Sequence, residues 1–151
     1  MGHVVIETLI VAPPEVVFDL ARDVSVHVES AAFSRERAVA PGRTEGLLEV
    51  GDIVTFEGVH FFLRLRFTVR IVELVRPHLF VDELERSAFR KLRHLHEFEE
   101  RDGATLMRDT LDWTSPFGLL GRIADVLFVT RHMRRFVRRK QLALKRVAES
   151  R

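Results

Sequence analysis

The stretch Lys91–Trp113 reads KLRHLHEFEERDGATLMRDTLDW and decides the fold. Two runs of alternating apolar and polar residues flank the dipeptide Asp102-Gly103, a pattern typical of a β-hairpin with a two-residue turn. Such a turn fixes the register of the two strands, because the residues on either side of it must pair in order. The stretch therefore predicts an antiparallel hairpin in which every cross-strand pair is known.

The two faces of this hairpin differ in chemistry. One face is apolar away from the turn except for His94, His96 and Asp109, and the register sets His96 opposite Asp109. The other face pairs Glu97 with Arg108, opposite charges that suit water. We expect the apolar face to form one wall of the interior. Its remaining pairs are Leu92 with Trp113, His94 with Leu111 and Phe98 with Met107.

The chain of 151 residues is the size of one domain, and we expect a single domain over residues 1–151. It contains no cysteine, which excludes disulfides and thiolate metal sites and favours a reducing compartment. The first residues, MGHVVIETLIVAPPE, lack the basic segment and long apolar run of a signal peptide. No apolar run approaches the roughly 20 residues of a membrane span. We therefore expect a soluble, cytoplasmic protein.

Positive charge is concentrated at the C-terminal end. The net charge is +2, but Leu119–Arg151 holds ten Lys or Arg residues against only Asp125 and Glu149. Such asymmetry occurs in proteins that bind nucleic acid or anionic membranes, and equally in helices with a solvated basic face. No aromatic residues interleave with the arginines on the outer face, so we expect no nucleic-acid partner. A transient membrane contact through this basic helix stays an alternative.

Upstream of the hairpin, the sequence predicts strands and two short helices. Pro13 and Pro14 end the first strand and allow a helix to begin, with Glu15 suited to its first turn. The predicted strands are His3–Val11, Phe33–Ala40, Ile53–His60, Phe61–Val75 and Leu79–Arg86, and the second short helix is Ser25–Ala32.

A long helix is predicted to follow the hairpin. Ser115-Pro116 is typical of a helix start, and apolar residues then recur at helical spacing from about Phe117 to Ala148. Gly118 and Gly121 predict a bend or a loose start. Consecutive hairpins and such a helix indicate an α+β fold of about seven antiparallel strands, with the helix across the sheet. The stripe comprises Ile123, Val126, Leu127, Thr130, Met133, Val137, Gln141, Leu144 and Ala148.

Five short motifs follow one another along the chain. They are APPEVVF at Ala12–Phe18, Gly51-Asp52, the strand Lys91–Phe98, GATLMRD at Gly103–Asp109 and SPFG at Ser115–Gly118. In this order they resemble the START/SRPBCC superfamily. The resemblance covers essentially the whole chain. The members that the chain resembles have the helix-grip fold of the birch pollen allergen and of polyketide cyclase/dehydrase proteins. The resemblance is closest to single-domain bacterial members. It implies a curved sheet gripping the C-terminal helix, with two short helices after the first strand and an apolar cavity between sheet and helix.

The resemblance also implies a function, the binding of a hydrophobic or amphipathic small molecule, lipid- or polyketide-like, in that cavity. The superfamily shares no single catalytic motif, so the fold does not transfer a reaction. The alternative is a cyclase, dehydratase or isomerase with His96 as general base and Asp109 fixing its tautomer. Asp109 can equally do no more than satisfy a buried histidine. Because the chain has no tyrosine to act as a phenolic acid, binding is favoured over catalysis.

Candidate ligand-binding residues come from the hairpin face, its neighbours and the helix stripe. We expect His94, His96 and Asp109 to orient the polar end of the ligand. His60 and Arg86 are expected to join them, since an arginine suits an anionic head group. The predicted apolar lining is Phe67, Leu84, Phe98, Met107, Leu111, Trp113, Leu127 and Met133.

Two polar residues have open roles. His27 is expected near the mouth of the cavity, either as an ordinary core or capping histidine or as part of the site. Asp82 shares a strand face with Arg86, and the two are expected to pair either inside the cavity or at the surface.

The two hairpin histidines and Asp109 offer two imidazoles and one carboxylate to a metal, because residues two apart on a strand share a face. The sequence places no third histidine beside them, and the resembled fold does not generally use a metal. We therefore expect no metal and no cofactor. The sequence makes no prediction of oligomeric state.

Overall fold

The computed structural model describes residues 1–151 and contains a seven-stranded antiparallel sheet in the order β1-β7-β6-β5-β4-β3-β2. The predicted α+β class and strand number are confirmed. The strands are β1 Gly2–Ile10, β2 Arg37–Val39, β3 Ile53–His60, β4 Leu63–Val75, β5 Leu79–Arg86, β6 Lys91–Arg101 and β7 Ala104–Thr114.

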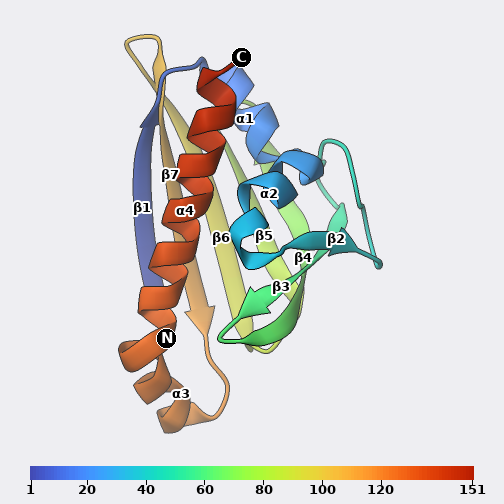
Figure 1. Ribbon diagram of the computed structural model, residues 1–151, viewed down its shortest axis with the longest axis vertical. Coiled ribbons are helices and arrows are strands. Elements are labelled where there is room, and N and C mark those ends of the chain that lie inside the picture. Colours follow the sequence, from blue (N-terminus) through green and yellow to red (C-terminus); the bar gives the residue numbers. More distant parts are fainter.

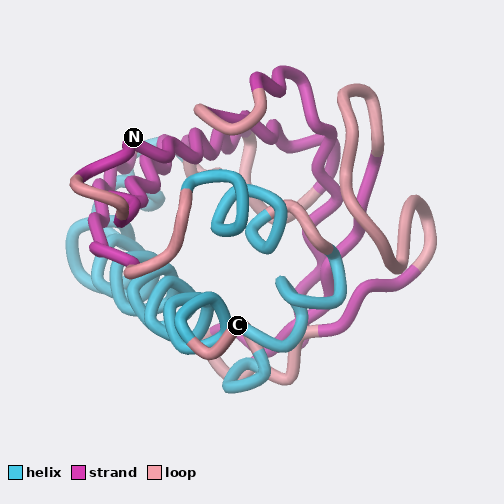
Figure 2. Tube along the Cα trace, turned by 90° about the horizontal axis from the view of Figure 1, so that it is seen from above, coloured by secondary structure: helices cyan, strands magenta, loops and turns pink.

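The helices lie on the concave face of the sheet. Two short helices, α1 (Pro14–Ala21) and α2 (Val24–Ser30), follow β1, as predicted. The chain ends in helix α3 (Gly118–Ala124), a π-helical turn η2 (Asp125–Val129) and helix α4 (Thr130–Glu149). Figure 1 shows α4 running along β1 and β7, with α1 and α2 beside it. Seen from above in Figure 2, the strands form an arc around the helices.

The register predicted for the central hairpin is confirmed. Strands β6 and β7 pair Leu92 with Trp113, His96 with Asp109 and Arg101 with Ala104. Both turn residues have a positive φ, 51° at Asp102 and 82° at Gly103. This is the conformation that a two-residue turn of the type I′ class requires and that Asp-Gly adopts readily.

The strand predicted at Phe33–Ala40 is wrong in its first half. Ala32–Ser34 form a 3-10 turn (η1) instead, and Arg35 follows in the left-handed conformation with a φ of 54°. That backbone reverses the chain, so only Arg37–Val39 pair with β3.

The C-terminal helix is continuous but not uniformly α-helical, and the predicted stripe is wrong in its first turns. A π-helical turn takes one more residue than an α-helical turn, so the residues before it rotate by one position relative to α4. Asp125 therefore points inward, while Val126 and Leu127 are 82% and 58% exposed. Ile123 is exposed as well. After the π turn the prediction is correct, and the buried residues are Met133, Val137, Gln141, Leu144 and Ala148.

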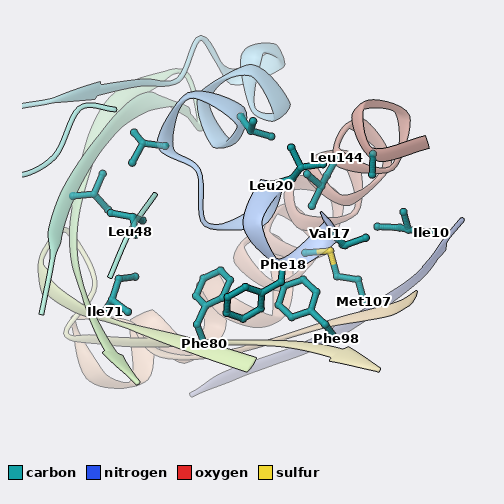
Figure 3. Close-up of a cluster of buried hydrophobic side chains, with 14 of the residues drawn as sticks. Ile10, Val17, Phe18, Leu20, Leu48, Ile71, Phe80, Phe98, Met107 and Leu144 are labelled. Carbon is teal, nitrogen blue, oxygen red and sulfur yellow. The ribbon is translucent and has the colours of Figure 1, made fainter. Parts of the chain in front are cut away.

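Phe18 of α1 lies at the centre of the larger core cluster. Its ring meets Phe80 and Phe98 edge-on, with centroids 5.5 Å and 5.2 Å away (Figure 3). A second, smaller cluster packs Leu111 and Trp113 of β7 under Met133 and neighbouring residues of α4. The larger core cluster fills the space between the sheet and helix α4 at the end next to α1. No helix is both long enough and apolar enough to cross a membrane.

We predict that Phe18→Ala lowers the free energy of unfolding by about 3–5 kcal/mol, because it removes a buried ring and leaves a cavity between two others. Urea denaturation followed by circular dichroism measures this change. The control is Phe62→Ala, because that side chain is 102% exposed. The control should shift the free energy by less than about 0.5 kcal/mol. Equal effects of the two substitutions would contradict the central place of Phe18.

Candidate functional site

Two adjoining cavities lie between the sheet and the C-terminal helix. The inner cavity, of about 110 Å³, is bounded by α2, the strands β3 to β7 and α4. The outer cavity, of about 260 Å³, lies next to α3 and reaches the surface at the exposed Phe117 and Leu120. His60, Phe67 and Met133 line both. The lining of each is mostly hydrophobic.

A cluster of two histidines and two carboxylates lies at the sheet wall of the inner cavity. Asp82 comes from β5, His94 and His96 from β6, and Asp109 from β7. Nε2 of His96 lies 2.9 Å from Oδ2 of Asp82. On the other side of the ring, Nδ1 of His96 lies 2.7 Å from Oδ1 of Asp109, a close ion-pair contact that is off the hydrogen-bonding direction. We call these four residues the His–Asp cluster.

His94 completes the cluster. Its ring stacks on that of His96 with centroids 3.7 Å apart, and its Nε2 lies 3.1 Å from Oδ1 of Asp109. Phe80 stacks on the other face of His96 with a centroid distance of 4.1 Å. The imidazole of His96 is therefore held between two rings and two carboxylates, and its orientation is fixed.

Asp109 is fixed from behind by the C-terminal helix. Gln141 of α4 donates from Nε2 to Oδ2 of Asp109 over 2.6 Å and to the backbone oxygen of Ile6 over 3.0 Å. Thr8 of β1 in turn donates to the Gln141 side-chain oxygen over 2.7 Å. Because Gln141 is 1% exposed, this amide joins β1, β7 and α4 at a point that water does not reach.

Burial and charge together set the protonation of the cluster. Burial disfavours the charged form of His96, but Asp109 and Asp82 outweigh burial and raise the pKa of His96 to about 9. Burial and the charge on His96 lower the pKa of His94. Burial would raise the pKa of Asp109 and Asp82, yet the histidines hold both below their usual range. At pH 7 a protonated His96 thus lies between two carboxylates, beside a neutral His94.

A second polar group faces the same cavity from the helical side. His27 of α2 contacts Oε1 of Glu36 through Nε2 at 2.7 Å, and its ring stacks on Phe56. Nζ of Lys140 lies 3.1 and 3.2 Å from the two ring nitrogens of His27. Burial and the Lys140 charge lower the pKa of His27 to about 4, so this ring is neutral at pH 7. We call His27, Glu36 and Lys140 the lysine group.

A pair of histidines lies where the two cavities meet. Nδ1 of His60 and Nε2 of His132 are 2.8 Å apart, which requires one ring to donate and the other to accept. Burial lowers the pKa of His60. Burial and the charges of His60 and Arg135 lower the pKa of His132 to about 4. Both rings are therefore neutral near pH 7 and can share one hydrogen bond.

Most of the predicted site residues do face these cavities. His94 and His96 line the inner one, and Asp109 faces a small adjoining space of about 30 Å³. The predicted residues found at a cavity wall are His60, Phe67, His94, His96, Met107, Asp109, Leu111 and Met133.

Arg86 and Leu127 lie away from the two cavities, where the sequence analysis did not expect them. Pairing between β5 and β6 ends at Glu83 with Arg93, so Arg86 lies beyond the covered part of the sheet and is exposed. It does not pair with Asp82, which contacts His96 instead. Leu127 is turned outward by the π turn.

Three predicted lining residues pack elsewhere. Phe98 is 3% exposed and packs against Phe18 in the core. Trp113 is 2% exposed and donates from Nε1 to Oδ1 of Asp125 over 3.1 Å. Leu84 is only partly buried and packs against the larger core cluster. These side chains support the cavity walls from outside the cavity.

Sequence reasoning identified His27 but missed its partners Glu36 and Lys140, as well as Gln141 as an anchor and His132. Lys140 and Gln141 are adjacent in a helix whose stripe was identified, and a glutamine inside an apolar stripe is a signal of a buried hydrogen bond. Nothing in the local pattern indicates Glu36, because a loop and a 3-10 turn bring it beside His27.

The residues best able to hold a metal are Asp82, His94 and His96. One donor atom from each lies within 4.8 Å of the others. This set differs from the sequence-based one, in which Asp109 was the carboxylate. Here Asp109 lies on the other side of the His96 ring from Asp82. Asp82 and His96 already form a hydrogen bond with each other.

Comparison with solved structures gives the fold. A protein of Thermus thermophilus is 18% identical, with 99% of this chain and 98% of that chain covered and a TM-score of 0.81. The Zhui aromatase/cyclase of a Streptomyces species is 15% identical over 97% and 93%, with a TM-score of 0.77. Major latex-like protein 151 of Panax ginseng is 10% identical over 97% of both chains, with a TM-score of 0.73. The chain therefore has the helix-grip fold of the SRPBCC proteins, as the motifs predicted.

Two other comparisons find no relative. No protein-family model matches the sequence. A search of curated proteins finds no match either.

We predict that His96 is protonated at pH 7 and loses its proton near pH 9, with Asp82, His94, Asp109 and Lys140 as its charged or titratable neighbours. Nitrogen-15 NMR of the imidazole rings measures this titration. Asp109→Asn should lower the pKa of His96, because one carboxylate is lost. The control Asp112→Asn lies on the opposite face of β7, next to His3, and should leave it unchanged. Titration of His96 at or below 6.5 would contradict the prediction.

The same shift predicts the direction of a stability change. Because the folded-state pKa of His96 is above its ordinary value of 6.5, its contribution to the free energy of unfolding is complete below pH 6.5. That contribution is lost as the pH rises through 9. His27 has a pKa of about 4 in the folded state. Its contribution to the free energy of unfolding is therefore complete above pH 6.5 and is lost as the pH falls towards 4. Urea denaturation across this range measures both slopes.

Proposed function

We propose that the protein binds a hydrophobic or amphipathic small molecule, lipid- or polyketide-like, in the cavity between the sheet and α4. The observation that carries this proposal is an apolar cavity whose inner end faces buried charges. The outer cavity has mostly hydrophobic walls, and the inner one is flanked by the His–Asp cluster and the lysine group. Such a site buries the apolar body of a ligand and orients it through a few polar contacts.

The lysine group supports recognition of a polar head group. An ammonium carries three N–H donors, and the only hydrogen-bond partner of Nζ of Lys140 is the ring of His27. A carboxylate, carbonyl or hydroxyl oxygen of a ligand in the inner cavity can accept one of the remaining donors. The positive charge of His96 is already neutralised by Asp82 and Asp109, so Lys140 is the cation that a ligand oxygen in the inner cavity would meet.

The shape of the site favours an elongated ligand. The outer and inner cavities, of about 260 and 110 Å³, share the walls formed by His60, Phe67 and Met133. A molecule with its head at Lys140 and its body beside Phe67 would leave its far end near Phe117, at the surface. The fold agrees with this reading, because the helix-grip fold is typical of proteins that bind hydrophobic ligands.

An enzyme of cyclase, dehydratase or isomerase type is the alternative. The similar structures include an aromatase/cyclase, and the cluster holds an imidazole in a fixed orientation at the cavity wall. The raised pKa changes the role that the sequence suggested. A histidine with a pKa of about 9 is protonated at pH 7, so His96 would act as general acid and not as general base. His94, with its lowered pKa, is the neutral imidazole of the pair.

We predict that the protein binds cis-parinaric acid, a fluorescent fatty acid, and that Met133→Trp weakens binding about tenfold or more by filling both cavities. Fluorescence titration measures the affinity. The matched control is Leu142→Trp, on the same helix but 43% exposed, and it should bind like the wild type. Lys140→Gln should weaken binding of the acid but not of the corresponding alcohol. Equal binding by all variants would refute a site in this cavity.

The enzymatic alternative is tested on any molecule that native mass spectrometry finds bound to the purified protein. It is extracted, identified by mass spectrometry and returned to fresh protein, and conversion to a product is followed over time. An enzyme should show a rate that depends on pH and collapses in both His96→Gln and Asp109→Asn. A molecule recovered unchanged from wild type and variants alike would support binding without catalysis.

A further inference from the structure

The turn between β3 and β4 holds two phenylalanines in an unfavourable backbone conformation. Phe61 and Phe62 both have a positive φ, 52° and 64°. A two-residue hairpin turn of this kind favours Asn-Gly or Asp-Gly, the chemistry found between β6 and β7, whereas bulky residues are strained there. This strain is not offset by packing in the hydrophobic core, because the Phe62 side chain is 102% exposed and that of Phe61 is 43% exposed. A strained, exposed, apolar turn points to a function outside the fold itself.

A second exposed apolar segment lies beside this turn, where the C-terminal helix begins. The rings of Phe61 and His132 are 4.4 Å apart, and both the turn and α3 line the outer cavity. The two segments therefore form one surface at the mouth of the cavity, at the end of the molecule where Figure 1 shows α3. We call it the apolar tip. Besides Phe61 and Phe62, its exposed residues are Leu63, Phe117, Leu119, Leu120, Val126, Leu127 and Phe128.

Positive charge accompanies the apolar tip, and negative charge does not. Between Ser115 and Ala148 the only acidic residue is Asp125, which is buried and accepts hydrogen bonds from Trp113 and Ser115. The charged side chains on this segment that face water are instead all cationic. The exposed ones nearest the tip are Arg122, Arg131, Arg134 and Arg135.

We propose that the apolar tip docks on the surface of an anionic lipid bilayer. Phe62 and the exposed side chains of α3 and η2 insert at the boundary between head groups and acyl chains, and the arginines contact lipid phosphates. Such a mode combines apolar area with a basic flank and needs no membrane-spanning segment. It places the membrane contact at the β3–β4 turn, α3, η2 and the first turns of α4, and not along the whole outer face of α4.

The charge pattern favours a bilayer over a second copy of the chain. A two-fold dimer places the same patch on both sides of its interface. The arginines of one copy would then face those of the other, with no exposed carboxylate on this helical segment to pair with them. An anionic bilayer supplies both the apolar interior and the negative charge that this surface lacks.

The docking mode also positions the cavity. The outer cavity reaches the surface between Phe117 and Leu120, inside the apolar tip. A ligand would therefore pass between bilayer and cavity without crossing water. This last step rests on the proposed function, whereas docking itself does not.

Vesicle co-sedimentation tests the proposal, with phosphatidylcholine alone and with phosphatidylcholine mixed with phosphatidylserine. Wild type should sediment with the mixed vesicles at low salt and be released at high salt. Phe62→Asp should lower the partition coefficient about tenfold or more, and so should Arg131→Glu combined with Arg135→Glu. The matched control is Val11→Asp, 68% exposed near the C-terminal end of α4, which should sediment like the wild type.

Absence of binding to mixed vesicles at low salt would overturn the proposal, as would binding that Phe62→Asp leaves unchanged. Sedimentation velocity supplies a second measurement. A wild-type dimer that dissociates in Phe62→Asp would show that the apolar tip binds a second copy of the chain, which would overturn the proposal. Circular dichroism checks that each variant is folded. Binding of cis-parinaric acid by Phe62→Asp in solution separates the two proposals, because its cavity residues are intact.

Discussion

The structure depends on the neutralisation of one buried carboxylate, that of Asp109. A carboxylate without partners between a sheet and a helix would cost more free energy than a small domain can spare. His96 supplies the opposite charge from β6, and Gln141 supplies a hydrogen bond from α4. Because Gln141 also holds Ile6 and Thr8, the same contact sets the position of the helix along β1. The cavity exists where this polar network keeps helix and sheet in register without filling the space between them.

Much of this arrangement could be predicted from local chemistry. The dipeptide Asp102-Gly103 determines the hairpin register, and the register alone brings His96 opposite Asp109. The alternation in β4 and the stripe after the π turn identify the inward faces of sheet and helix. These predictions succeed because each depends on a period or a turn within about 30 residues of sequence.

The rest could not be predicted because it depends on contacts between distant elements. Asp82 meets His96 through the pairing of β5 with β6, and an alternating pattern alone leaves a partner such as Arg86 equally plausible. The π turn is set by tertiary contacts, since Asp125 turns inward to accept hydrogen bonds from Trp113 and Ser115. The raised pKa of His96 follows from two carboxylates that outweigh burial, and sequence alone does not bring both of them to the ring.

The strand order has a consequence for the way the protein is made. The first strand, β1, pairs along its whole length with β7, so Gly2 lies opposite Trp113. During synthesis on the ribosome, β1 precedes β7, and even its last residue, Ile10, pairs with a residue 95 positions later, Thr105. Contacts of such long sequence separation slow folding, and an unpaired apolar strand is open to association with other chains in the meantime. On the outward face of β1, the polar side chains of His3 and Glu7 alternate with Val5 and Leu9 and limit such association.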